Sequence, residues 1–261
     1  MAHIRISILT GSNLPNLLRE ADNYLALIGR HGSKFSRIGI VCCRQTVSTL
    51  IDNGENTSLS SDDNEEKEMI NEETYSEDHS RQINYHKAQQ CFWLGHHERC
   101  YRCIEKLLQI AGTAHYRLVT LFYHGLNSFA LMRKGKFVKR CSQIYKAALA
   151  ELLKAEELSK WNYRNKVYLL QAEKHSFKGR DEEARTSYGS AIIAARTSKF
   201  VQEQGLACEC AGFHCKRMGD LEQAWRFLNQ AKTCYEKWGS SMKVDFITRQ
   251  MDELPNPNQT N

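Results

Sequence analysis

The sequence predicts an all-α protein in which helix pairs stack into a repeat solenoid. Glycine recurs at intervals of 40, 44 and 40 residues, at Gly95, Gly135, Gly179 and Gly219, and a fixed period of this size indicates a repeat architecture. Only three prolines occur in 261 residues, and the abundance of Leu, Ala, Glu and Lys favours helix throughout. Apolar or small residues lie nine and twelve positions after each glycine, at Ile104, Ile144, Tyr188 and Leu228 and at Leu107, Ala147, Ala191 and Ala231. Such pairs bury their apolar stripes by stacking on their neighbours.

Two helices of the array are expected within residues 1–51. Apolar residues from Leu14 to Ile28 recur at helical spacing. Ser12 or Asn13 could cap this helix, and Pro15 suits its first turn. A second helix is expected from about residue 34 to 51, before the stop signal Asn53-Gly54. The short apolar segment at residues 4–9 is predicted to be the end of a helix that lacks its partner.

Residues 52–82 are predicted to form a disordered acidic loop inserted between helices. Residues 52–79 hold eleven acidic residues and one lysine, a local charge of −10, within a chain of net charge +6. Such a segment has too few apolar side chains to offset the entropy of ordering it. The remainder of the chain then carries +16.

Helical repeats are expected from residue 83 to 254. The predicted pairs are 83–94 with 97–111, 115–133 with 137–157, 164–178 with 181–197, and 201–217 with 221–237. A last helix over about 241–253 ends before Pro255, because the residue before proline disfavours the helical conformation. Residues 255–261 are expected to be a disordered tail. Ala147, Ala191 and Ala231 are expected to let paired helices approach closely.

Residues 161–180, WNYRNKVYLLQAEKHSFKGR, begin a stretch with a specific resemblance. From about residue 155 to 254, and more loosely at 14–35, the chain resembles the tetratricopeptide-like helical arm of large signalling ATPases. Those proteins join a serine/threonine kinase-like domain, an AAA ATPase, this arm, a GAF sensor and a histidine kinase. The matching positions are Trp161, Asn165, Lys166, Leu169, Ala172, Glu173, Gly179, Arg180, Ala184, Tyr188, Ala191, Phe200, Val201, Gln202, Leu206, Ala207, Glu209, Ala211, Gly219, Tyr235, Trp238, Gly239, Lys243 and Val244.

The resemblance implies a tetratricopeptide-like solenoid that acts as a scaffold or couples a sensor to an ATPase. Four residues depart from the family pattern, which usually has larger or more helix-favouring residues there: Gly205, Cys208, Cys210 and Gly212. The acidic loop is foreign to the pattern too. No kinase, ATPase, GAF or histidine-kinase motif occurs in the sequence, so the resemblance assigns no catalytic residue.

Two groups of cysteine and histidine were weighed as metal sites. His96, Cys100 and Cys103 could share one face of a helix as soft zinc ligands. No second ligand pair is evident, and a cysteine in an apolar register usually serves as a small hydrophobic residue. In the second group, Cys208 and Cys215 share one helical stripe while Cys210 and His214 share another. Core packing is the preferred interpretation of both groups, and no metal or cofactor is predicted.

A dense basic cluster around Gly135 is the candidate partner-binding surface. It consists of Arg133, Lys134, Lys136, Lys139 and Arg140. Such a cluster can bind phosphates or an acidic protein surface. The alternatives are a solvated turn between helices and an attraction to the chain's own acidic segment at residues 52–79. Aromatic residues do not interleave with these cations as they do in single-strand nucleic-acid platforms.

The expected function is therefore non-catalytic protein–protein interaction within a signalling assembly, with a protein partner such as an ATPase or a sensor kinase. No membrane span or export signal is evident, and ten cysteines in a long chain fit a reduced cytoplasmic compartment. One alternative is a basic solenoid that binds nucleic acid or phosphate. Another is a truncated fragment without independent function.

Overall fold

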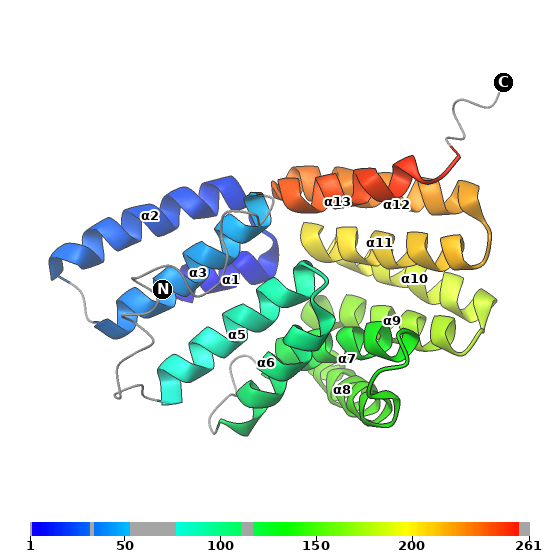
Figure 1. The fold of residues 1–261 in the computed structure, drawn as a ribbon, viewed down its shortest axis with the longest axis horizontal. Coiled ribbons are helices and arrows are strands. Elements are labelled where there is room, and N and C mark those ends of the chain that lie inside the picture. Colours follow the sequence, from blue (N-terminus) through cyan, green and yellow to red (C-terminus); the bar gives the residue numbers. More distant parts are fainter. Residues whose placement is uncertain (1, 32–33, 53–76, 111–116, 256–261) are drawn as a thin grey trace. The chain divides into compact units, whose positions relative to one another are not determined.

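The computed structural model describes residues 2–31, 34–52, 77–110 and 117–255, and their regular structure is entirely α-helical. This confirms the all-α prediction for these residues. The helices are α1 (Ala2–Thr10), α2 (Leu14–His31), α3 (Lys34–Ile51), α5 (Glu77–Trp93), α6 (His97–Gln109), α7 (Arg117–Arg133), α8 (Val138–Leu158), α9 (Lys160–Phe177), α10 (Asp181–Thr197), α11 (Val201–Arg217), α12 (Leu221–Trp238) and α13 (Ser241–Asp252) (Figure 1).

Packing groups the helices into two compact units. The first consists of residues 1–116 and 240–242, and the second of residues 117–239 and 243–261. Helices α5 and α6 were expected to be the first pair of a continuous repeat array. Instead they belong to the first unit, where α5 packs against both α3 and α6.

The prediction that the segment at residues 4–9 lacks a partner is wrong. Ile4 is fully buried in a cluster with Ala21, Ile40 and Cys43. Helix α1 therefore packs against α2 and α3. At the start of α2, the Asn13 side chain is the cap, since its Oδ1 accepts a hydrogen bond of 3.3 Å from the Asn16 N–H.

The predicted acidic loop ends before residue 82, where the prediction placed its last residue. Helix α5 begins at Glu77, so residues 77–82 are helical and Gln82 is buried. Glu77 and Asp78 lie in the first turn of this helix, where negative charge interacts favourably with the helix dipole. The predicted disorder of residues 53–76 and of the tail from residue 256 lies outside the described residues.

In the second unit, helices that follow one another in the chain pack side by side, from α7 to α12 (Figure 1). Alternate helices also meet, α7 with α9 and α9 with α11. Helix α9 begins at Lys160, four residues before the predicted start at 164. The predicted bounds of α10 and α11 are confirmed.

The recurring glycines end helices in both units, as predicted. Gly95, Gly135, Gly179 and Gly219 have φ of 73°, 70°, 71° and 80°, the left-handed conformation in which glycine commonly terminates a helix. The residue after each glycine donates its N–H to a carbonyl five positions earlier, for example Arg180 to His175 over 3.0 Å. The period in the sequence thus reflects a repeated helix-ending turn.

Helix α8 departs from the predicted register by one residue. Helices α6, α10 and α12 begin two positions after their glycine, whereas α8 begins three positions after Gly135. The additional turn residue is Phe137, with φ of 50°. Ala191 and Ala231 are fully buried as predicted, but Ala147 is exposed and Ala148 is fully buried in its place.

Buried ion pairs join alternate helices of the second unit. They link α7 to α9 through Arg133–Glu173 at 2.5 Å, α9 to α11 through Lys166–Glu203 at 2.7 Å, and α11 to α13 through Glu209–Lys243 at 2.8 Å. Tyr188 and Tyr235 donate hydrogen bonds of 2.5 Å to Glu173 and Glu209. Charged side chains therefore form part of the core of this unit.

Gly212 of α11 lies where α12 approaches too closely for a larger residue, which the sequence did not indicate. A Cβ at Gly212 would lie 2.8 Å from Leu228 Cγ and 3.2 Å from the backbone oxygen of Ala224 on α12. We expect Gly212→Ala to lower the free energy of unfolding by about 1–2 kcal/mol, because overpacking outweighs the gain in helix propensity. Urea denaturation measures this change.

Gly189 in α10 provides the matched control, since a Cβ there would meet no atom within 4 Å. Gly189→Ala should stabilise the protein by about 0.5–1 kcal/mol. Equal effects of the two substitutions would contradict the close approach of α11 and α12.

Candidate functional site

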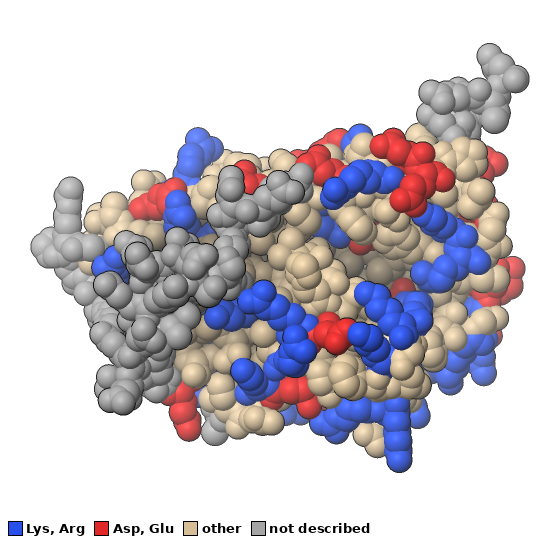
Figure 2. Space-filling model, viewed as in Figure 1, with Lys and Arg blue, Asp and Glu red and all other residues tan. Residues whose placement is uncertain are grey.

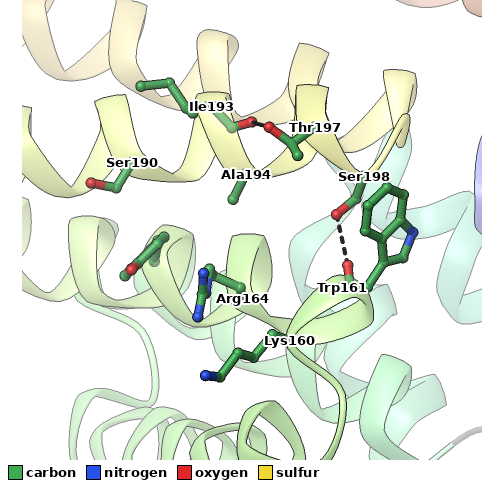
Figure 3. Close-up of a pocket in the computed structure, with 9 residues that line it drawn as sticks. Lys160, Trp161, Arg164, Ser190, Ile193, Ala194, Thr197 and Ser198 are labelled. Atoms are coloured by element: carbon green, nitrogen blue, oxygen red, sulfur yellow. Dashed lines mark hydrogen bonds between the residues drawn. The ribbon is translucent and has the colours of Figure 1, made fainter.

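A surface pocket of about 350 Å³ lies between α9 and α10 in the second unit (Figure 3). Helix α9 contributes aromatic and cationic side chains, and α10 with its C-terminal residue contributes small and apolar ones. The lining residues are Lys160, Trp161, Arg164, Tyr168, Ser190, Ile193, Ala194, Thr197 and Ser198. Nothing in the sequence analysis singled out this pocket.

Two large apolar side chains of the pocket face solvent. Trp161 is 54% exposed and Ile193 is 56% exposed. Their backbones are held in place, because the Ser198 hydroxyl donates to the Trp161 carbonyl over 2.8 Å and Thr197 donates to the Ile193 carbonyl over 2.9 Å (Figure 3). Neighbouring exposed apolar side chains are typical of binding surfaces, where tryptophan is enriched among the residues that dominate affinity.

Cationic side chains lie next to this apolar surface. The Arg164 Nε–H donates to Glu156 Oε1 over 3.1 Å, which orients the guanidinium and balances part of its charge. Lys160 adds a further ammonium group to the lining. Among the described residues that line the pocket, none carries a carboxylate, an imidazole or a thiol. The lining suits an apolar side chain with negative charge nearby.

The structure divides the predicted basic cluster around Gly135. Arg133 is half-buried, and besides its ion pair with Glu173 its Nη2 donates to Ser176 Oγ over 3.3 Å. Its guanidinium is thus engaged within the unit. Lys134, Lys136, Lys139 and Arg140 are exposed, and their role in partner binding stays a prediction.

The same turn carries apolar residues that the sequence analysis did not consider. Phe137 is 50% exposed and Val138 is 46% exposed. Phe137 belongs to the longer turn before α8, so it lies outside the helical spacing of the apolar residues. The exposed cluster is therefore amphipathic, with a phenylalanine among cations.

The first group considered as a possible metal site, His96 with Cys100 and Cys103, is not assembled. His96 is exposed, whereas Cys100 is fully buried with Ala88, Cys91 and Ile104. Cys100 lies five positions after its glycine, as the fully buried Ala184 and Ala224 do. It therefore occupies a position for a small core residue.

Cys208 and His214 of the second group face different neighbours, as predicted for the two stripes of the helix. Cys208 approaches Gln230 of α12, whereas His214 bonds to Ser176 of α9 and Asp181 of α10 at 3.0 and 2.8 Å. Within the part of the chain that the structure describes, no group of three or more His, Cys, Asp or Glu is arranged to hold a metal ion.

No family model, no curated protein and no solved structure matches this chain. Among the described helices, none is both long enough and apolar enough to cross a membrane. All ten cysteines are free thiols.

Proposed function

We propose that this chain is a non-catalytic protein-binding module, and that its pocket between α9 and α10 binds a partner segment with an apolar side chain next to acidic residues. The observation that carries the proposal is the pairing of exposed Trp161 and Ile193 with Lys160 and Arg164 in one pocket. An apolar side chain of the partner would cover the Trp161 indole, and carboxylates of the partner would interact with Lys160 and Arg164.

The proposal includes a tetratricopeptide-like arrangement for the second unit. Its support is the packing of successive and alternate helices, together with the recurring glycine turns. The resemblance to the arm of signalling ATPases suggests the class of partner, an ATPase or a sensor kinase.

Figure 2 bears on the alternative of a nucleic-acid-binding solenoid. On the face that it shows, the basic side chains form several groups separated by neutral and acidic surface. On this face, neither unit by itself shows a continuous positive track of the kind that follows a phosphate backbone. This observation favours a partner segment with local acidic charge over a polynucleotide.

The test is a selection of displayed random peptides on the full chain and on two variants. We expect the selected peptides to combine an apolar residue with acidic neighbours. Trp161→Ala should weaken their binding at least tenfold, because it removes the largest exposed apolar side chain of the pocket. Affinities are measured by fluorescence anisotropy with one selected peptide.

Leu158→Ala is the matched control, since Leu158 is 91% exposed and does not line the pocket. This variant should bind the peptides as the native chain does. Peptides that bind Trp161→Ala unchanged would overturn the proposal. So would a chain that selects no peptide but binds an oligonucleotide with steep salt dependence.

A further inference from the structure

A second pocket, in the first unit, carries an inference independent of the proposed function. It has a volume of about 490 Å³ and lies between α5 and α6. Four cationic side chains line it, one from α5 and three from α6. The lining residues are Ser80, Ile83, Asn84, Lys87, Arg99, Arg102, Cys103 and Lys106. No carboxylate is among these described residues, and their four cations suit the pocket to an anion.

One cysteine of a neighbouring pair lines this cationic pocket. Cys103 is half-buried and lines the pocket, whereas Cys91 of α5 is 2% exposed. Cys103 packs against the core cluster of α5 and α6 that contains Cys91. A half-buried cysteine in a pocket and a buried cysteine beside it are the parts of a dithiol site.

Electrostatics favour the thiolate at the accessible position. The hydrogen bond from Cys91 lowers the pKa of Cys103 to about 7, against the effect of burial, and Arg99, Lys87 and Lys106 lower it further. The same hydrogen bond, followed by burial, raises the pKa of Cys91. Burial and the charge of Cys103 raise the pKa of Cys100, the third cysteine nearby. A thiolate is the form that reacts with disulfides.

We propose that Cys103 and Cys91 form a thiol–disulfide exchange site whose cationic pocket selects small anionic disulfides, such as those that carry carboxylates. The Cys103 thiolate attacks one sulfur of the disulfide R–S–S–R, forms a Cys103–S–S–R bond and releases one R–S⁻. Cys91 then loses its proton to solvent and attacks the Cys103 sulfur. A Cys91–Cys103 disulfide forms and the second R–S⁻ leaves. Two protein thiols are oxidised, and one disulfide is reduced to two thiolates.

The test compares two small disulfides of opposite charge on the reduced full chain. Glutathione disulfide carries carboxylates and is anionic at pH 7, whereas cystamine is cationic. Mass spectrometry of peptides follows the modification of Cys103, and each rate is divided by the rate of the same disulfide with N-acetylcysteine. We expect the normalised rate to be at least tenfold higher for glutathione disulfide at low salt. The ratio should fall towards one at high salt, because salt screens the cations.

Two kinds of variant test separately the preference for anionic disulfides and the attack of Cys91 on the mixed disulfide. Arg102→Glu and Lys106→Glu should each lower the normalised rate for glutathione disulfide severalfold, whereas Lys146→Glu, at an exposed lysine of α8 in the second unit, should leave it unchanged. In Cys91→Ser the glutathione adduct should persist on Cys103, while the native chain should proceed to the internal disulfide.

Equal normalised rates for the two disulfides would overturn the proposed anion selectivity. A mixed disulfide that persists in the native chain as long as in Cys91→Ser would overturn the role of Cys91. First modification of another of the ten thiols would overturn the assignment to Cys103.

Discussion

Replacing Glu203 by Gln is expected to lower the free energy of unfolding of the second unit by about 3–5 kcal/mol. The Lys166 and Glu203 side chains are 6% and 3% exposed, and their charged atoms lie 2.7 Å apart. Asn165 also donates to this carboxylate, and the Lys166 ammonium lies 4.8 Å from the centre of the Phe200 ring. Glutamine retains the shape but leaves the Lys166 ammonium buried without a counter-charge, so the loss includes the cost of that desolvated charge.

The same substitution on the surface provides the control. Glu222 pairs with Arg226 one turn along α12, with side chains 58% and 55% exposed, so Glu222→Gln should change stability by less than about 0.5 kcal/mol. Urea denaturation gives the overall change, and hydrogen exchange of peptides from α9 and α11 localises it. A small effect of Glu203→Gln on both measurements would contradict a buried ion pair.

The double variant Lys166→Met with Glu203→Leu distinguishes the cost of an uncompensated charge from the strength of the pair. Apolar residues of similar volume remove both charges together, and such replacements are often close to neutral. We therefore expect the double variant to recover much of the stability that Glu203→Gln loses. A double variant less stable than Glu203→Gln would indicate that the pair itself stabilises the unit strongly.

Most helix ends could be predicted from the sequence because local chemistry determines them. Gly179 and Gly219 adopt the left-handed conformation that ends a helix, and this preference depends on the missing Cβ alone. The register of α8 could not be predicted in the same way. One further turn residue, Phe137, shifts the buried alanine from position 147 to 148, and no glycine stands at that position to indicate its left-handed conformation.

The charged core could not be predicted from composition, because lysine and glutamate are rarely buried unless they are paired. Lys166 and Glu203 lie 37 residues apart in the chain, so neither residue identifies its partner locally. Several polar residues that carried the resemblance to the ATPase arm take part in the buried ion pairs and hydrogen bonds around Glu173, Glu203 and Glu209. They are Asn165, Lys166, Glu173, Tyr188, Glu209, Tyr235 and Lys243.

The candidate pockets depend on contacts between helices. Trp161 was included in the resemblance, but its exposure follows from how α9 packs on α10. The basic cluster at Gly135 was predicted from the sequence, but the partner of one of its cations was not. Its charges were apparent in the sequence, yet Arg133 is engaged with Glu173, which lies 40 residues away.

Acidification is expected to destabilise the first unit through His86, by about 3 kcal/mol at pH 4. Burial, with a smaller effect from Arg5, lowers the pKa of His86 from 6.5 to about 3. Its ring nitrogens lie 3.0 Å from Thr46 Oγ1 and 3.6 Å from Cys43 Sγ. Thr46 also donates to the Cys42 carbonyl and accepts from Gln90, so a neutral imidazole satisfies the buried polar atoms around it.

The sign of this effect follows from proton binding. Between about pH 6.5 and pH 3 the unfolded chain protonates this histidine and the folded chain does not. The stability that His86 contributes is therefore complete above pH 6.5 and is lost progressively as the pH falls towards 3. In the second unit, burial together with Arg140 lowers the pKa of His124 to about 4, so the same direction is expected there.

Hydrogen exchange of peptides from α3 and α5 between pH 4 and 7, corrected for the intrinsic exchange rate, measures the slope of stability in the first unit. His86→Gln should flatten this slope, whatever the variant costs at neutral pH, because the difference in proton binding disappears with the imidazole. His96→Gln removes an exposed histidine next to α6 and should retain the native slope. An unchanged slope in His86→Gln would mean that other groups of the first unit cause its acid sensitivity. A flattened slope in that variant alone would identify the buried imidazole as the group that limits stability in acid.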